Sequence, residues 1–174
     1  MKFTITRATF IKSLNDVSRA ISTKTTIPIL TNLKLDLTDT ALILTGSDAD
    51  ISIESKIDAT SETNDLQVQS TGSITLPARF FSEIVKRLPE KTMTVDVQDN
   101  FQTVITSGQS EFKINGLDAN NYPRLPEIAA ENPLTVPADV LRQLIAQTVI
   151  AVSTQETRPI LTGVHIQIQN GQLI

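Results

Sequence analysis

The sequence contains no cysteine and no tryptophan, and only one histidine and one tyrosine in 174 residues. Without cysteine, the chain can form no disulfide, hold no metal through thiolates and use no cysteine nucleophile. This absence fits a cytoplasmic protein, which is the location that we expect. The chain also has no apolar run of membrane-spanning length. Its hydrophobic content of 40% is typical of a globular protein with enough residues for one core and part of another.

Residue types that support catalysis are sparse and scattered. The single histidine, His165, lies in an alternating segment and is expected on the solvent side of a strand. Asp48 and Asp50 follow Gly46 and Ser47. They could hold a metal, but an acidic turn between strands is the preferred interpretation. The sequence has no glycine-rich phosphate loop, no metal-ligand spacing and no nucleophile motif. We therefore expect no active site, no metal and no cofactor, and a structural or binding role.

The most informative feature is an internal repeat. Residues 153–162 match residues 22–31 at seven of ten positions, with a constant offset that places Pro159 on Pro28. The offset continues without a gap in both directions, since Phe10 aligns with Leu141 and Leu42 with Leu173. Self-similarity at a fixed long period indicates a chain built from copies of one unit. The second copy ends at Ile174, inside what the first copy makes a strand, so we expect a piece of a longer protein.

Apolar periodicity predicts an α+β fold. Helical spacing is found over 10–21, where Phe10, Leu14 and Val17 recur, over 77–88, and over about 137–152. In the second helix the apolar face comprises Phe80, Phe81, Ile84, Val85 and Leu88. Alternating segments between the helices predict antiparallel strands. A shorter echo, 76–81 against 136–141, divides the unit into two halves, each a strand, a helix and a strand meander.

The charge is unevenly distributed. The three predicted helices with their following turns (7–24, 77–91 and 137–158) carry ten Lys/Arg and five Asp/Glu, a balance of +5 within a chain of net charge −4. Exposed helix faces commonly carry such residues. Alternatively, the helices share a surface that faces a polyanion. With few aromatic residues for stacking on bases, the pattern favours loose, sequence-independent contact with a phosphate backbone.

Several motifs together resemble the bacterial DNA sliding clamp family, the beta subunit of DNA polymerase III. They span the whole chain and comprise Met1-Lys2-Phe3-Thr4-Ile5, Thr26-Ile27-Pro28-Ile29-Leu30, Gly46-Ser47-Asp48, Leu76-Pro77-Ala78-Arg79-Phe80-Phe81, Asn121-Tyr122-Pro123 and Thr157-Arg158-Pro159-Ile160-Leu161-Thr162-Gly163. The resemblance implies a non-catalytic, ring-shaped processivity factor of chromosomal replication. In this family each chain has three copies of one domain, and two chains join head to tail around double-stranded DNA. Helices line the hole and sheets form the rim.

The resemblance also implies roles for particular residues. Lys24 and Gln155 match DNA-contacting loops, and Arg7, Lys12 and Arg79 are further candidates that face the DNA. Phe112 and Ile114 match apolar strand positions at the dimer interface, although an ordinary core position is the alternative. Leu161 matches one wall of a pocket for short peptide motifs from the replicative polymerase and the clamp loader, and Arg158 borders it. The rest of that pocket would lie beyond Ile174.

The expected domains are residues 1–120, a complete first clamp domain, then a linker over 121–131, and the start of a second clamp domain over 132–174. Two other function classes remain open. One is a non-enzymatic tandem-repeat module for protein interactions, for which an acidic chain is natural. The other is a hydrolase with its site elsewhere, against which the absence of catalytic motifs argues.

Overall fold

The computed structural model describes residues 1–22, 24–60, 65–123, 135–155, 157–169 and 172–173. The chain divides into two compact units, Met1–Pro126 and Glu127–Ile174. Of the linker expected at 121–131, only 121–123 are described. Tyr122 in this segment is 3% exposed, so its ring belongs to the packed interior of the first unit.

Both halves of the first unit contain a strand, a helix and a strand meander in that order, and the second half has the strand β5 in addition. Its first half comprises β1 (Lys2–Thr6), α1 (Arg7–Ser18), the 3-10 helix η1 (Pro28–Thr31), β2 (Asn32–Leu37), β3 (Ala41–Ser47) and β4 (Ser52–Asp58). Its second half comprises β5 (Gln67–Ser70), β6 (Gly72–Pro77), α2 (Ala78–Arg87), β7 (Thr92–Val97), β8 (Gln102–Ser107), β9 (Ser110–Asn115) and the 3-10 helix η2 (Ala119–Asn121). The predicted α+β class and its strand–helix–meander halves are confirmed.

Each half contributes the strand that precedes its helix to the sheet of the other half: β1 joins the strands of the second half, and β6 joins those of the first. All pairings are antiparallel, and the sheets have the orders β4-β3-β2-β6 and β5-β1-β7-β8-β9. In the register of β1 with β7, Phe3 lies opposite Val95, and in that of β2 with β6, Leu35 lies opposite Ile74. Each half therefore completes the sheet of the other, so neither half forms its sheet alone.

The core lies between the sheets and the two helices. α1 packs against β3 and β4, and α2 packs against β2 and β6. Phe10 of α1 and Phe81 of α2 meet edge to face, with ring centroids 5.6 Å apart, and Phe3 of β1 lies 6.4 Å from Phe10. All three side chains are fully buried. Burial of a phenylalanine side chain contributes roughly 1.5–3 kcal/mol, so this aromatic cluster anchors both helices to the sheets.

The second unit reproduces the beginning of the first at the predicted offset. It comprises α3 (Ala138–Thr148), the 3-10 helices η3 (Val149–Ala151) and η4 (Pro159–Thr162), and the hairpin of β10 (Ile168–Gln169) with β11 (Gln172–Leu173). The starts of α3 and η4 are the positions that the repeat aligns with the starts of α1 and η1. Even the register repeats, because Ile168 pairs with Leu173 as Leu37 pairs with Leu42. No residue whose burial is described in this unit is buried.

Candidate nucleic-acid interface

Lysines in the strands of the first unit are neutralised by neighbouring carboxylates. Each forms an ion pair on its own sheet: Lys2 with Asp96 at 3.1 Å, Lys34 with Asp36 at 2.9 Å, Lys56 with Asp58 at 2.7 Å, and Lys113 with Glu111 at 3.0 Å. Three of these pairs join alternate residues of one strand, a spacing that places both side chains on the same face. These lysines therefore contribute little net field to the solvent.

Cations on the helices and in the turns that follow them are mostly unpaired. Within the described part of the chain only Arg87 of this group forms an ion pair, with Glu83 at 3.0 Å. The others form no ion pair with a described residue; they are Arg7, Lys12, Arg19, Lys24, Arg79, Lys86, Lys91, Arg142 and Arg158. Uncompensated positive charge therefore lies on the helices and their turns, where a polyanion would be attracted.

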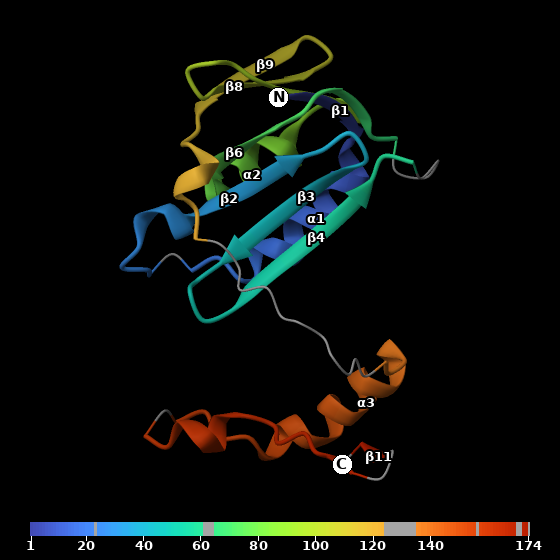
Figure 1. Ribbon diagram of the computed structural model, residues 1–174, viewed down its shortest axis with the longest axis vertical. Helices are drawn as coiled ribbons and strands as arrows, with labels where there is room; N and C mark the ends of the chain where they lie inside the picture. The colour runs from blue at the N-terminus through green and yellow to red at the C-terminus, as the bar shows by residue number, and fades with distance from the viewer. Residues whose placement is uncertain (23, 61–64, 124–134, 156, 170–171, 174) are drawn as a thin grey trace. The chain divides into compact units, whose positions relative to one another are not determined.

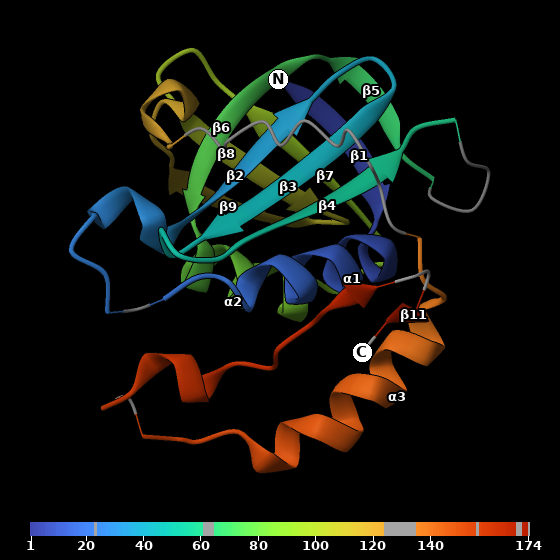
Figure 2. The same cartoon turned by 60° about the horizontal axis from the view of Figure 1, so that its bottom comes forward.

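In the first unit the two helices form one surface. Figures 1 and 2 show α1 and α2 side by side on the same side of both sheets. Arg79 at the start of α2 is exposed. Lys12 is also exposed and borders a small hollow between α1 and β4 together with Asp16. Arg19, Lys86 and Lys91 are also exposed and form no ion pair with a described residue, but they are not among the predicted DNA contacts. The sequence contains a signal for them, because most strand lysines have a carboxylate two positions away and these three residues do not.

Arg7 differs from the other predicted contacts because its side chain is used within the fold. Its guanidinium donates a hydrogen bond to the backbone carbonyl of Leu88, directly after the end of α2. Its backbone N–H donates to the carbonyl oxygen of Lys91 at 2.8 Å. A helix end leaves carbonyl groups without partners, and a basic side chain satisfies them. Arg7 therefore connects the start of α1 to the end of α2.

Lys24 and Gln155 occupy equivalent turns of the two repeats. The backbone N–H of Lys24 donates to Ser22 Oγ at 3.1 Å, and that of Gln155 donates to Ser153 Oγ at the same distance. Both side chains are exposed. A serine turn of this kind fixes the local backbone while leaving the side chain two positions later free. The repeated loops therefore present a cation in the first unit and a neutral donor in the second.

The predicted dimer-interface residues lie on β9, an edge strand. Among the described residues β9 pairs with β8 alone. Phe112 is 38% exposed, whereas Ile114 is partly buried against the core. The alternative of an ordinary core position therefore holds in part for Ile114 and not for Phe112. An edge strand with an exposed aromatic residue is suited to pairing with another chain.

Leu161 lies in η4 and is 52% exposed. It lines a hollow of about 300 Å³ with Val152, Ile160 and Val164 among others. Arg158 immediately precedes η4 and is exposed, but it does not line this hollow. The described residues thus form an apolar wall that includes Leu161.

The acidic segment after β3 is a turn. Asp48 Oδ1 accepts hydrogen bonds from the backbone N–H groups of Ile51 at 2.8 Å and Asp50 at 3.1 Å, which lower the pKa of the Asp48 carboxyl.

Among the described residues no group of three or more histidines or carboxylates is arranged to hold a metal. No helix in the described ranges is long and apolar enough to cross a membrane.

Comparison with known families identifies the chain. The family model of the DNA polymerase III beta subunit, N-terminal domain, matches residues 1–126, and that of its central domain matches residues 135–174. The chain belongs to the DNA polymerase III beta-subunit family. The first match covers the same residues as the first compact unit.

Similar members of this beta-subunit family include the beta sliding clamps of Bacillus subtilis (strain 168) and Staphylococcus aureus (strain Mu50 / ATCC 700699). Each is 49% identical over 175 residues, which cover 100% of this chain and 46% of the relative. The crystal structure of the DNA polymerase sliding clamp from Bacillus subtilis matches with a TM-score of 0.94 at 49% identity, covering 99% of this chain and 46% of that one. That of the beta subunit from DNA polymerase of Streptococcus pyogenes gives a TM-score of 0.91 at 45% identity, covering 98% and 44%. The chain spans about half the length of these relatives.

Proposed function

We propose that this chain is part of a ring-shaped sliding clamp that encircles duplex DNA and tethers a replicative polymerase. Family membership supports the proposal. The observation that carries it is the distribution of ion pairs, because the strand lysines are paired, while the cations of the helices and their turns, apart from Arg87, form no ion pair with a described residue. A ring is retained by its topology, so its contacts with DNA must be weak enough to slide. Unpaired, scattered cations without base-reading groups meet this requirement.

We assign the DNA-facing role to Lys24, Gln155, Arg79 and Lys12. Arg7 lies on the same helix surface and contributes mainly by positioning α1 against α2. These contacts are to phosphates and carry no sequence information.

Further parts of the proposal concern assembly and location. Phe112 and Ile114 on β9 meet a second chain in a head-to-tail homodimer, and Leu161 with Arg158 forms part of a pocket for peptide motifs of the polymerase and the clamp loader. Residues 1–120 form a clamp domain, to which the buried Tyr122 also belongs, so that the linker expected at 121–131 begins after Tyr122, and residues 132–174 form the start of a second domain. The protein is cytoplasmic and acts as a polymerase accessory subunit without an active site of its own.

The test of the DNA-facing surface compares two matched double variants. Lys24→Gln with Arg79→Gln removes two unpaired helix-side cations, and Lys34→Gln with Lys56→Gln removes two paired strand cations. Binding of a fluorescent duplex is measured by anisotropy over a range of salt concentrations. The helix-side variant is expected to bind more weakly and to lower the salt slope by about 1 for each phosphate that it no longer neutralises.

The strand variant is expected to retain the parent's salt slope, since its lysines are already neutralised. Equal weakening in the two variants would contradict a DNA-facing helix surface. No duplex binding by any form of the protein, with intact binding of protein partners, would favour the tandem-repeat interaction module instead.

A further inference from the structure

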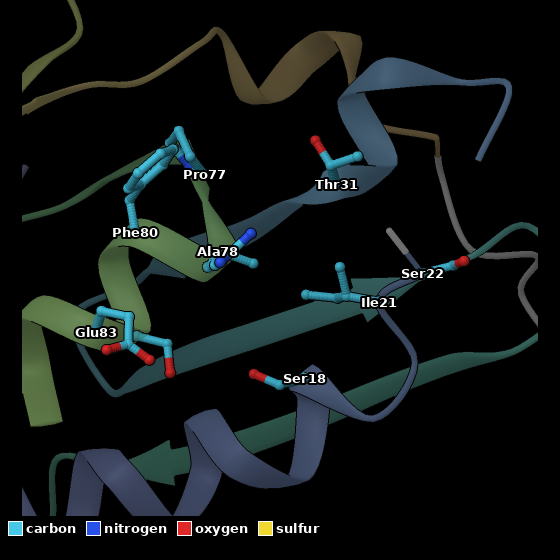
Figure 3. A pocket seen from close by; sticks show the side chains of 10 residues that line it. Ser18, Ile21, Ser22, Thr31, Pro77, Ala78, Phe80 and Glu83 are labelled. Atoms are coloured by element: carbon cyan, nitrogen blue, oxygen red, sulfur yellow. The ribbon is translucent and has the colours of Figure 1, made fainter. Parts of the chain in front are cut away.

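A hollow of about 390 Å³ lies at the start of α2, on the side of the first unit that carries both helices. Figure 3 shows its walls: Ser18 and Ile21 from the end of α1 and the residues after it, Thr31 from η1, and Pro77, Ala78 and Phe80 from the start of α2. Its volume falls within the range of small-ligand and side-chain pockets. No residue predicted for peptide binding lines it.

The hydroxyl of one largely buried residue opens into this hollow and has no hydrogen-bond partner among the described residues. Ser82 is 9% exposed and lines the hollow, yet its hydroxyl forms no hydrogen bond with any described residue. The hydroxyls of Ser18 and Thr31, by comparison, donate to the carbonyl oxygens of Leu14 and Pro28. Ser82 is therefore available to a ligand.

The hollow is also positively polarised. α2 begins after Pro77, which provides no side-chain cap, and the first turn contains no acidic residue. Backbone N–H groups at such a helix start lack internal partners and attract anions. Arg79 is exposed and forms no ion pair with a described residue, whereas the carboxylate of Glu83, which also lines the hollow, is paired with Arg87 at 3.0 Å. The charge that complements this arrangement is negative.

The same hollow has an apolar wall. Ile21, Pro77 and Ala78 line it, and Phe80 stands beside them with 68% of its surface exposed. The sequence pattern placed Phe80 on the apolar face of the helix. In the structure the side chains of Phe81 and Val85 are buried in the core, whereas that of Phe80 lies on an exposed part of the helix surface. An exposed aromatic side chain beside an apolar hollow is typical of a recognition site.

We propose that this hollow binds a linear peptide segment of a partner protein in which a carboxylate directly neighbours an apolar side chain. The carboxylate accepts hydrogen bonds from the first-turn N–H groups of α2 and pairs with Arg79. The apolar side chain fills the space between Ile21 and Phe80, and Ser82 satisfies a backbone group of the peptide. Duplex DNA suits the site less well, because its outer surface presents phosphates but no apolar group to fill the hollow. The proposal goes beyond the DNA-encircling function and does not depend on it, although both assign a role to Arg79.

The test titrates the ¹⁵N-labelled chain with the peptide acetyl-Gly-Leu-Asp-Gly-amide, followed by amide NMR. Two matched peptides remove one recognised feature each: acetyl-Gly-Leu-Asn-Gly-amide lacks the charge, and acetyl-Gly-Gly-Asp-Gly-amide lacks the apolar side chain. Saturable shifts are expected at the amides of Ala78, Arg79, Phe80 and Ser82. Both matched peptides are expected to bind at least about threefold more weakly.

Variants of the chain separate recognition from general charge. Arg79→Gln is expected to weaken binding of the parent peptide at least about threefold while leaving the affinity for the Asn peptide unchanged. Lys86→Gln, which removes a charge of the same helix outside the hollow, is expected to leave both affinities unchanged. Ser82→Ala is expected to weaken binding of both peptides.

Absence of saturable shifts at the four amides would overturn the proposal, as would equal affinity for the parent and Asn peptides. Shifts of these amides with a short duplex, together with none from the peptide, would assign the hollow to DNA instead. Failure of the whole protein to bind DNA, with intact peptide binding, would refute the proposed function and leave this site standing.

Discussion

Two fully buried threonines in the strands of the first unit differ in what their hydroxyls contact. Thr75 Oγ1 donates to the carbonyl oxygen of Leu117 at 3.1 Å and accepts from Asn32 Nδ2 at 3.4 Å. Thr103 Oγ1 has no hydrogen-bond partner among the described residues. A buried hydroxyl without a partner destabilises a fold, whereas a bonded one contributes about 1 kcal/mol.

Thr103→Val is therefore expected to raise the free energy of unfolding by about 1 kcal/mol, since it replaces an unsatisfied hydroxyl with a methyl group of similar size. Thr75→Val is the matched control and is expected to lower it by a similar amount. Urea denaturation followed by circular dichroism measures both. A decrease in stability for Thr103→Val as large as that for Thr75→Val would contradict the assignment.

Asp48 gives a prediction for pH. Its pKa is lowered in the folded state by the backbone N–H groups of Ile51 and Asp50. A carboxyl with a lowered pKa stabilises the fold above its unfolded value, near 3.8, and this contribution disappears as the pH falls through the folded pKa. Asp48→Asn is thus expected to be less stable than the parent at neutral pH, with the difference shrinking below about pH 4. Denaturation midpoints over a pH series measure the difference in stability between Asp48→Asn and the parent, with Asp50→Asn as the control variant. A difference that does not change with pH would contradict this role of Asp48.

At the residue scale, the spacing of charged residues in the sequence predicts some of the ion pairs but not all of them. The ion pairs of Lys34, Lys56 and Lys113 follow from same-strand neighbours two positions away. The pair of Lys2 with Asp96 depends on the register of β1 with β7, which local sequence does not encode. The sequence likewise predicts the positive helices but cannot identify Arg7 as a residue that connects two helices.

At the scale of elements, α1 lies unusually close to β3. A Cβ atom at Gly46 would come within 2.4 Å of the carbonyl oxygen of Val17 in α1. The backbone of α1 can move away from such a contact only at a cost in stability. The absence of a side chain at position 46 therefore allows α1 to pack closely against β3.

Gly46→Ala is therefore expected to lower the free energy of unfolding by about 1–3 kcal/mol, the usual cost of overpacking. Gly163→Ala is the matched control, since nothing lies within 4 Å of its Cβ position and its φ of −110° suits any residue. Thermal unfolding of the two variants provides the comparison. An unchanged Tm for Gly46→Ala would show that α1 can shift at no cost in stability.

The repeat made the second unit predictable. Equivalent residues of the two units form the same helix start, the same 3-10 turn and the same hairpin register, because the same side chains meet the same local constraints. The burial of a residue in the first unit does not predict the burial of its equivalent in the second unit. Leu14 is fully buried in α1, but its equivalent Ile145 in α3 is exposed, since burial depends on the strands that cover a helix.

At the scale of the whole first unit, strand exchange was beyond sequence reasoning. Each half has the pattern of strand, helix and meander, yet β1 joins the meander of the second half and β6 that of the first. Such pairings join residues far apart in sequence, and periodicity reports only which face of a strand is apolar. The exchange brings α1 and α2 together on one side, and so assembles the cationic surface from separate segments.

The central claim is that these helices face DNA enclosed by a ring. Its most direct test loads a full-length family member containing this sequence onto nicked circular DNA and measures retention before and after the circle is linearised. Topological enclosure predicts stable retention on the circle, even at salt concentrations that abolish phosphate contacts, and rapid release from free ends after linearisation. Equal retention on circular and linear DNA would contradict the account.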